Sequence, residues 1–331
     1  MARVDSFYDA LADQYGYTEP QTAVAGLSEY HVERRYALVD NADAVFDVDA
    51  DRLFLASAGM SGPPHLGTLS QLHAARELAD AGLDIEFLLA DLEKYLGSGM
   101  SMANVTDLAD RYRGLARELG YKGAIRTQSG DREVMAAAMR LSRYYETDLL
   151  PDVDWESTAW EEALDRAYEA AGVDRSDGDG VTEFARKQTG ALCAADFLHP
   201  LMAEGYDVFV AVLGAEEHAL TLRNREMQRR AGVDGRLGGL YTRIVRGLDD
   251  YPKMSKRIPP SVISLDMQPS EIRERIHAAS DERLWEFLSL ASEYSPSELD
   301  ALEQARNQDR ERWESTRAAY ADRLAELATY W

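Results

Sequence analysis

The sequence predicts an α/β protein with a doubly wound, Rossmann-like parallel sheet and a helical C-terminal region. Three observations predict this class. Short apolar runs bounded by glycine and proline indicate buried strands, helical periodicity fills the intervals between them, and after residue 269 only helical signal remains. The main strands are expected at 52–58, 84–91 and 207–213.

The first two strands and the segment between them form a βαβ unit. Residues 59–67 are a loop rich in glycine and proline, and a helix then begins near Thr68 and ends at Gly82. The crossover should be right-handed and the strands parallel. Further helices are expected at about 103–119, 132–146, 155–171, 182–203 and 216–231, with a short strand at 123–127 and a polar break at 174–180.

Four segments are expected along the chain, and the last of them should contain a long helix that starts at Pro296 and runs towards Trp331. The segments are an N-terminal lead-in at 1–50, a Rossmann-like domain at 51–248 with a helical insertion around 100–205, a loop and helix at 249–278, and a short helical region at 279–331.

The composition indicates a soluble protein. Of the 331 residues, 45% are hydrophobic, enough for one large domain with a helical appendage or for two domains. No run approaches the roughly 18 apolar residues that span a bilayer, and no secretory segment follows the N-terminus, so we expect a cytoplasmic protein without a membrane partner. The single cysteine, Cys193, excludes an intramolecular disulfide, and six scattered histidines predict no structural zinc site.

The charge is strongly acidic. A formal charge of −23, with five lysines among 36 basic residues, is typical of proteins that stay soluble in concentrated salt. We interpret it as halophilic adaptation, with an acidic binding face as the alternative. Within 222–257 a local cationic strip opposes this trend: Arg223, Arg225, Arg229, Arg230, Arg236, Arg243, Arg246, Lys253, Lys256 and Arg257.

The loop after the first strand has the composition of a phosphate site. Gly59, Gly62 and Gly67 allow the backbone to approach a ligand, and the helix N-terminus that follows supplies N–H donors and partial positive charge. His65 stands at this helix start. An ordinary βα turn with a surface histidine is the alternative interpretation.

A second loop concentrates lysine, the scarcer basic residue of this chain. Lys253, Ser255 and Lys256 lie between two aspartates, at 249–250, and two prolines, at 259–260. Two ammonium groups and a hydroxyl could stabilise the charge that builds on an α-phosphoryl group as pyrophosphate leaves. A solvated basic loop is the alternative.

These two motifs resemble the nucleotide-binding signatures of class I aminoacyl-tRNA synthetases: Pro64-His65-Leu66-Gly67-Thr68 early in the chain, and Lys253-Met254-Ser255-Lys256-Arg257 late in it. The 88–96 segment resembles archaeal-type tyrosyl enzymes, and the 214–218 segment resembles one shared by the tyrosyl and tryptophanyl enzymes. The resemblance covers about residues 50–278 and implies their Rossmann-like, HUP-type fold; residues 279–331 lack a clear match to the family's anticodon-reading domain.

The resemblance implies an ATP site. His65 would contact the phosphates, Gly67 would leave room for adenine and ribose, and Lys253, Ser255 and Lys256 would hold the α-phosphate and pyrophosphate. Thr68 replaces the family's final histidine, and Arg257 replaces a small residue. The other implied ATP-binding residues are Gly62, Thr68, Gly214, Glu216 and Met254.

The implied amino-acid pocket departs from the family. Asp196 stands where tyrosyl enzymes keep the aspartate for the phenolic hydroxyl, whereas Leu55 replaces its partner tyrosine. Side-chain selection should therefore differ. Thr189, Cys193 and Glu217 stand in place of tyrosine, glutamine and glutamine around the substrate's ammonium group, and Asp91 completes the set. Alternatively, Leu55 and Cys193 are core residues, and Thr189 and Asp196 belong to a helix face.

The resemblance implies an ATP- and Mg²⁺-dependent ligase, active as a homodimer, that activates an amino acid of the tyrosine or tryptophan kind and transfers it to tRNA. Such chemistry needs no side-chain nucleophile or protein metal site, and the sequence offers neither. Two alternatives stay open: a paralogue that activates an amino acid for a non-tRNA acceptor, and a catalytically silent RNA-binding protein that uses the cationic strip.

Overall fold

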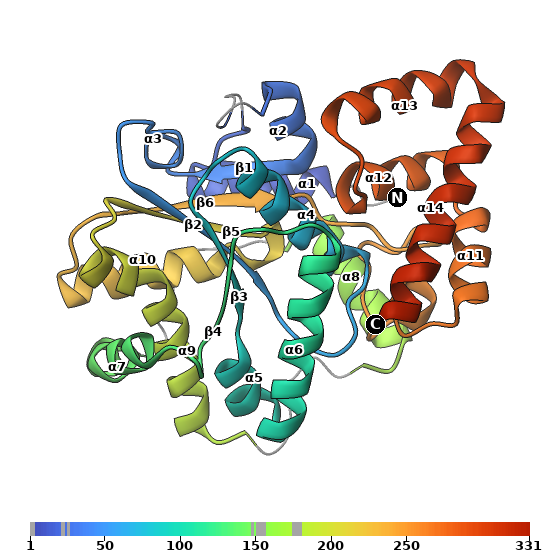
Figure 1. The fold of residues 1–331 in the computed structure, drawn as a ribbon. Helices are drawn as coiled ribbons and strands as arrows, with labels where there is room; N and C mark the ends of the chain where they lie inside the picture. The colour runs from blue at the N-terminus through green and yellow to red at the C-terminus, as the bar shows by residue number, and fades with distance from the viewer. Residues whose placement is uncertain (1–3, 21–23, 25–26, 147–148, 150–156, 174–180) are drawn as a thin grey trace.

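The computed structural model describes residues 4–20, 24, 27–146, 149, 157–173 and 181–331, and it contains a six-stranded sheet with the order β1-β6-β5-β2-β3-β4. β1 is antiparallel to β6, and the other neighbouring strands are parallel (Figure 1). The strands are β1 (Tyr36–Asp40), β2 (Arg52–Ala58), β3 (Ile85–Leu89), β4 (Ala124–Thr127), β5 (Val208–Gly214) and β6 (Arg236–Thr242). The predicted α/β fold and its four expected strands are confirmed.

The sequence analysis did not predict β1 and β6, the two strands that pair at one side of the sheet. β6 contains Gly238 and Gly239, which weaken a strand pattern, and it lies within the basic region. A Cβ at Gly238 would lie 2.7 Å from the Val45 side chain, so close packing explains this glycine. β1 has only five residues and belongs to the predicted lead-in, which therefore contributes a strand to the sheet.

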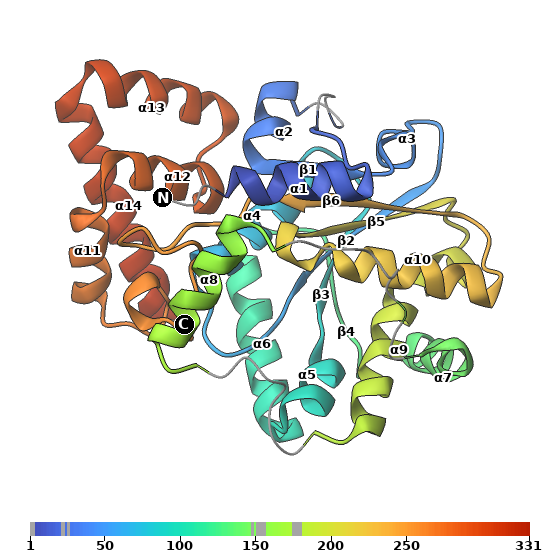
Figure 2. The same cartoon turned by 180° about the vertical axis from the view of Figure 1, so that it is seen from behind.

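Helices cover both faces of the sheet, and this follows from the alternation of side chains along the strands. In β2, Phe54 and Ala56 join the core beneath one helical layer, whereas Leu53 and Leu55 join the core on the opposite face. Figures 1 and 2 show the two layers from opposite sides. The chain is thus doubly wound.

The helices agree with the expected ranges except at particular ends. α4 begins at Leu66, two residues before the expected start, and the expected long helix is interrupted at Asp309. The helices α1, α2, α3 and α5 were not predicted. The polar break at 174–180 and residues 155–156 lie outside the described residues. The helices are α1 (Asp5–Tyr15), α2 (Glu29–Arg35), α3 (Ala42–Val45), α4 (Leu66–Asp80), α5 (Asp91–Ser98), α6 (Met102–Glu118), α7 (Arg132–Leu141), α8 (Ala159–Ala170), α9 (Glu183–His199), α10 (Ala219–Ala231), α11 (Pro269–Ala278), α12 (Asp281–Ala291), α13 (Pro296–Gln308) and α14 (Arg310–Tyr330).

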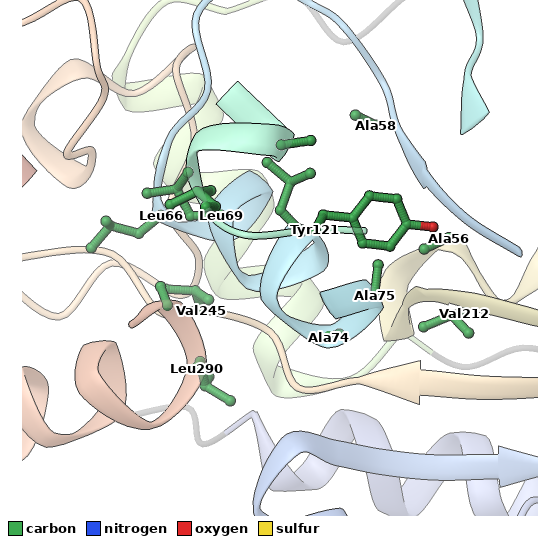
Figure 3. Close-up of a cluster of buried hydrophobic side chains, with 14 of the residues drawn as sticks. Ala56, Ala58, Leu66, Leu69, Ala74, Ala75, Tyr121, Val212, Val245 and Leu290 are labelled. Atoms are coloured by element: carbon green, nitrogen blue, oxygen red, sulfur yellow. The ribbon is translucent and has the colours of Figure 1, made fainter. Parts of the chain in front are cut away.

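The helix α4 packs across the centre of the sheet. Figure 3 shows Leu69 and Ala75 of α4 among the buried side chains, with Ala56 of β2 and Val212 of β5. Leu290 of α12 belongs to the same cluster, so the C-terminal helices pack onto the helix that starts at the first motif. Of the described helices, none is both long and apolar enough to cross a membrane.

Candidate active site

The two motifs line one cleft, at the carboxyl ends of the central strands. The cleft has a volume of about 750 Å³, and Ser57 and Ala58 of β2, Gly214 of β5 and Thr242 of β6 form its floor. β2 lies between β5 and β3, where the chain passes from one half of the sheet to the other; ligands of open α/β sheets bind at such switch points. The site residues predicted from the sequence that line it are His65, Gly67, Thr68, Gly214, Glu216, Glu217, Lys253, Met254, Ser255 and Lys256.

Backbone contacts hold the early loop against the segment that follows the late loop. The amide of Leu66 donates to the carbonyl of Ile263 at 3.2 Å, and the amide of Leu265 donates to Pro64 at 2.9 Å. Gly62 is absent from the cleft lining, but a Cβ built there would lie 3.8 Å from Lys256 Nζ. The pairing fixes the two motifs relative to each other.

His65 caps the helix that points at the cleft. Its Nδ1 accepts a hydrogen bond from the Thr68 amide at 3.3 Å, so the first turn of α4 has a side-chain acceptor. A Cβ at Gly67 would lie 2.7 Å from the imidazole ring, which explains the glycine. Burial, Lys256 and Lys253 lower the pKa of His65 to about 3, so the ring is neutral.

The two lysines have different electrostatic environments. Lys253 Nζ lies 2.9 Å from Glu216 Oε1, and this carboxylate raises the pKa of Lys253. Burial would raise the pKa of Glu216, but Lys253 reverses the shift and lowers it. Lys256 donates to the Pro63 carbonyl at 3.0 Å, and burial and Lys94 lower its pKa to about 8.

The backbone of the late loop is firmly held. Met254 is 2% exposed, and its amide donates to the Val245 carbonyl at 2.9 Å. The amide of Ser255 donates to Ser261 Oγ at 3.1 Å, and Ser255 Oγ lies 3.2 Å from the Tyr168 hydroxyl. The buried methionine therefore anchors the loop while the flanking lysines reach into the cleft.

The expected amino-acid residues fall into two groups. Glu217 lines the cleft and is accessible from it, but the surrounding walls limit its hydration; burial and Glu216 raise its pKa to about 7. Asp196 is 1% exposed and bonded within the protein, accepting from Arg126 Nη1 at 2.7 Å and from Gln128 Nε2 at 2.6 Å. Burial raises the pKa of Asp196 even though Arg126 opposes the shift.

The other expected pocket residues lie outside the cleft lining. Leu55 is 3% exposed in the sheet core, and Asp91 accepts hydrogen bonds from Ser129 at the start of α5. Thr189 Oγ1 donates to the Ala185 carbonyl at 3.0 Å. Cys193 Sγ accepts from Asn224 Nδ2 at 3.5 Å, and burial and the charge of Glu93 raise the pKa of this thiol.

Comparison with known proteins shows which family this chain is similar to. Residues 179–328 match the family model of class I tRNA synthetases for tryptophan and tyrosine. The chain is related to these class I synthetases. The match extends to residue 328, beyond the range of about 50–278 over which the motifs showed the resemblance.

Individual relatives agree with the family model. A tyrosine–tRNA ligase of Legionella pneumophila (strain Paris) is 30% identical over 115 residues, 33% of this chain and 28% of that protein. The ligase of Archaeoglobus fulgidus is 25% identical over 224 residues, 66% of this chain and 61% of its own length. The chain therefore spans less than two thirds of the length of these relatives.

Solved synthetase structures share the fold. The tyrosyl-tRNA synthetase of Archaeoglobus fulgidus complexed with L-tyrosine superposes with a TM-score of 0.65 at 19% identity, covering 90% of this chain and 96% of that one. The tryptophanyl-tRNA synthetase of Aeropyrum pernix gives a TM-score of 0.68 at 18% identity, with 98% and 94% covered.

The sequence analysis did not predict several residues that line the cleft. Lys94 is one of them, so three of the five lysines of the chain line the cleft. The scarcity of lysine was a usable signal, since Lys94 lies inside a segment already recognised. Tyr112 and Tyr168 carried no comparable signal, because only the fold brings them to the cleft, and Arg243 was noted only as part of the cationic strip.

The cationic strip of the sequence is largely paired with acidic residues in the structure. Acidic residues pair with six of its ten basic residues, and five of these acidic residues come from outside 222–257. Arg236, at the start of the strand β6, is one of the six. The pairs are Arg225–Asp40, Arg229–Glu226, Arg230–Glu146, Arg236–Asp47, Arg246–Glu286 and Lys253–Glu216.

Proposed function

We propose that the protein activates an amino acid with ATP, giving aminoacyl-AMP and pyrophosphate, and transfers the aminoacyl group to the 3′-terminal ribose of a tRNA. One observation carries the proposal: the capped N-terminus of α4, with His65, and the lysines 253 and 256 line the same cleft. The relatives, named tyrosine–tRNA ligases, support an amino acid of the tyrosine or tryptophan kind.

In the first step, a carboxylate oxygen of the amino acid attacks the α-phosphorus of ATP. The new oxygen–phosphorus bond forms as the bond to the bridging oxygen of pyrophosphate breaks. Charge builds on the phosphoryl oxygens and on the leaving group, and the ammonium groups of Lys253 and Lys256 stabilise it. Neutral His65 orders the first turn of α4 by accepting from the Thr68 amide, and the partial positive charge of this helix end would face the phosphates.

In the second step, a ribose hydroxyl of the tRNA attacks the activated carbonyl carbon, AMP leaves and the hydroxyl proton is released. No enzyme nucleophile is required, since the mixed anhydride is already reactive. The cleft accelerates this step by holding the ribose hydroxyl and the carbonyl carbon in a reactive orientation. We propose that the protein acts in the cytoplasm as a homodimer.

Mg²⁺ fits this reaction as a companion of the nucleotide. Among the described residues, no group of three or more histidine, cysteine, aspartate or glutamate side chains could hold a metal. Phosphate oxygens would be the principal ligands, as in other nucleotide sites with few protein ligands. The Mg²⁺ ion would neutralise part of the negative charge of the phosphates.

Exchange of labelled pyrophosphate into ATP, dependent on an added amino acid and measured in high salt, tests the first step. We expect exchange, and we expect the variant Lys253→Ala plus Lys256→Ala to lower it by about two orders of magnitude or more while the circular dichroism spectrum is unchanged. An undiminished rate in the double variant contradicts the role of this loop.

Acylation of bulk tRNA tests the second step. Labelled amino acid should become attached to tRNA in the presence of ATP. Exchange without acylation would instead identify a paralogue that serves another acceptor, and neither reaction would favour the silent RNA-binding protein.

A further inference from the structure

A buried tyrosine that the proposed function does not use joins the cleft to the helix α6. Tyr112 is 1% exposed and lines the cleft. Its hydroxyl donates to the backbone carbonyl of Gly62 at 3.0 Å, in the glycine-rich loop before α4. Burial raises the pKa of this hydroxyl, although a hydrogen bond with the Thr68 side chain lowers it, so the hydroxyl stays protonated at neutral pH. Tyr112 therefore contacts both the loop and the first turn of α4.

The Gly62 carbonyl lies next to the contact that joins the two motifs. Lys256 Nζ donates to the carbonyl of the following residue, Pro63, at 3.0 Å. Two adjacent carbonyls of one loop are thus bound from two sides, by a hydroxyl of α6 and by an ammonium group of the late loop. Gly62 has a φ of 116°, and because glycine adopts many conformations readily, its backbone alone does little to fix the loop. The hydroxyl of Tyr112 supplies that restraint.

The ring of Tyr112 is held in turn by the residue that follows α14. The Trp331 ring lies edge-on to the Tyr112 ring, with the centroids 5.1 Å apart and the planes at 78°. Arg111 places its Cζ 4.4 Å from the centroid of the Trp331 ring and donates to the Trp331 carbonyl. Figures 1 and 2 show the end of α14 beside α6 from opposite sides. Two consecutive residues of α6 therefore hold Trp331, and one of them reaches the cleft.

The end of α14 has a second fixed contact with α6. A Cβ at Gly114 would lie 2.9 Å from the Tyr330 hydroxyl, so close packing explains a glycine inside α6, where it costs about 1 kcal/mol relative to alanine. The amide of Trp331 donates to the Leu327 carbonyl at 2.8 Å, which continues the helical hydrogen bonding to this residue. Helical structure and side-chain packing together place Trp331 against Tyr112.

We propose that Tyr112 is a positioning residue of the nucleotide site and that Trp331 orients its ring, so that nucleotide binding in the cleft and docking of the end of α14 on α6 stabilise each other. This inference rests on the proposed function for the identity of the nucleotide. Each step from the cleft to α14 is a direct contact, first between Gly62 and Tyr112 and then between Tyr112 and Trp331. The effect must be mutual, because a coupling free energy between two sites is reciprocal.

Calorimetric titration with ATP and Mg²⁺, in high salt and without an amino acid, tests the first contact. We expect Tyr112→Phe to raise the Kd about tenfold, because it keeps the ring but leaves the Gly62 carbonyl without this donor. In pyrophosphate exchange, the same variant should raise KM for ATP more than it lowers kcat.

Tyr121→Phe is the matched control for the loss of a buried hydroxyl. Tyr121 is also 1% exposed, but it lies outside the cleft lining, and its hydroxyl donates to the Ile85 carbonyl at 2.9 Å. This variant should lower the free energy of unfolding and leave the Kd for ATP unchanged. An unchanged Kd in Tyr112→Phe, or an equal rise in both variants, would overturn the inference.

Trp331→Ala tests the second contact, because it removes the ring that packs on Tyr112. We expect the Kd for ATP to rise about threefold or more, and Trp331→Phe, which keeps an aromatic ring, should restore the affinity. In a Tyr112→Phe background, Trp331→Ala should have little further effect, since its influence passes through the missing hydroxyl. Fully additive effects of the two substitutions would exclude this connection.

Hydrogen exchange measures the coupling in the reverse direction. Bound ATP should slow the exchange of amides at the end of α14, including the Trp331 amide that donates to Leu327. In Tyr112→Phe, at an ATP concentration that saturates the variant, this protection should be lost. Equal protection in the two proteins would contradict the coupling.

The titrations need no amino-acid substrate, so they separate the inference from the proposed function. If pyrophosphate exchange fails with every amino acid, an ATP affinity that depends on Tyr112 still supports the inference while the proposed function fails. If exchange proceeds but Tyr112→Phe binds ATP as the unmodified protein does, the inference fails and the proposed function stands. A protein that does not bind ATP at all overturns both.

Discussion

The ammonium group of Lys256 donates a hydrogen bond of 3.0 Å to the backbone carbonyl of Pro63, a residue 193 positions earlier in the chain. This contact joins the two motifs directly, beside Gly62. Lys256 is easier to deprotonate than an ordinary lysine, because burial and the nearby Lys94 disfavour its charged form and lower its pKa.

The first prediction concerns pH. Because the pKa of Lys256 is lowered to about 8, the charged form is lost as pH rises through that value, and kcat/KM for ATP in the exchange reaction should fall there. In Lys256→Arg the fall should move to higher pH, since arginine stays charged. Lys122→Arg, at an exposed position outside the cleft, is the control. A rate that stays level above pH 8 in the unmodified protein contradicts this role.

The second prediction concerns Gly67. A methyl group at this position would meet the His65 ring at 2.7 Å and push the imidazole off the Thr68 amide. Gly67→Ala should weaken ATP binding by about tenfold, measured by calorimetry. In a His65→Ala background the added methyl should have little further effect. Equal effects in both backgrounds would show that the clash is not the cause.

The sequence predicted the parts of the fold whose signals are local. β2, β3 and β5 are apolar runs ended by glycine or acid, and α4 follows a glycine-rich loop. β1 and β6 lack such signals, because β1 is short and β6 has two adjacent glycines that are explained only by close contacts. Pattern alone does not reveal such packing.

The site was predicted only where its residues belong to local sequence motifs. The lysine pair and the histidine turn are motifs, and the structure places them in one cleft. A hydrogen-bonded network joins β4, α5 and α9 with the turn after β4, through Arg126, Asp196, Gln128 and Glu93. No motif or residue spacing in the sequence predicts this network. Leu55 and Asp196 were assigned to a pocket by family register, whereas the packing places Leu55 in the core and binds Asp196 internally.

The third prediction concerns the buried ion pair that ties α2 to α4. Arg35 is 1% exposed and pairs with Glu77, whose Oε2 also lies 2.9 Å from His31 Nε2. Arg35→Met leaves the Glu77 carboxylate buried without its main partner, and should lower the free energy of unfolding by about 3–5 kcal/mol in urea titrations. Arg113→Met, which breaks an exposed pair with Asp110, should cost less than about 1 kcal/mol.

The same pair predicts acid sensitivity. Burial would raise the pKa of Glu77, but Arg35 and His31 lower it to about 2 from an ordinary value of 4.5. The stabilisation is therefore present above pH 4.5 and is lost as pH falls towards 2. Arg35→Met should lack most of this loss. Identical acid-unfolding curves for the two proteins would exclude the pair as the source.

The fourth prediction concerns salt. With a formal charge of −23, like charges repel in the folded state at low ionic strength, and salt screens this repulsion. The Tm should rise steadily from about 0.1 M to about 2 M potassium chloride, as followed by circular dichroism. A Tm that is flat or falls across this range would argue against halophilic adaptation.

A crystal structure with a non-hydrolysable ATP analogue, grown in high salt, tests most directly whether the His65 turn and the lysine loop bind one triphosphate. The account predicts the phosphates between the α4 N-terminus and the loop, with Nζ of Lys253 and of Lys256 within about 3 Å of phosphate oxygens. A nucleotide bound elsewhere, or a triphosphate in contact with only one of the two loops, would contradict it.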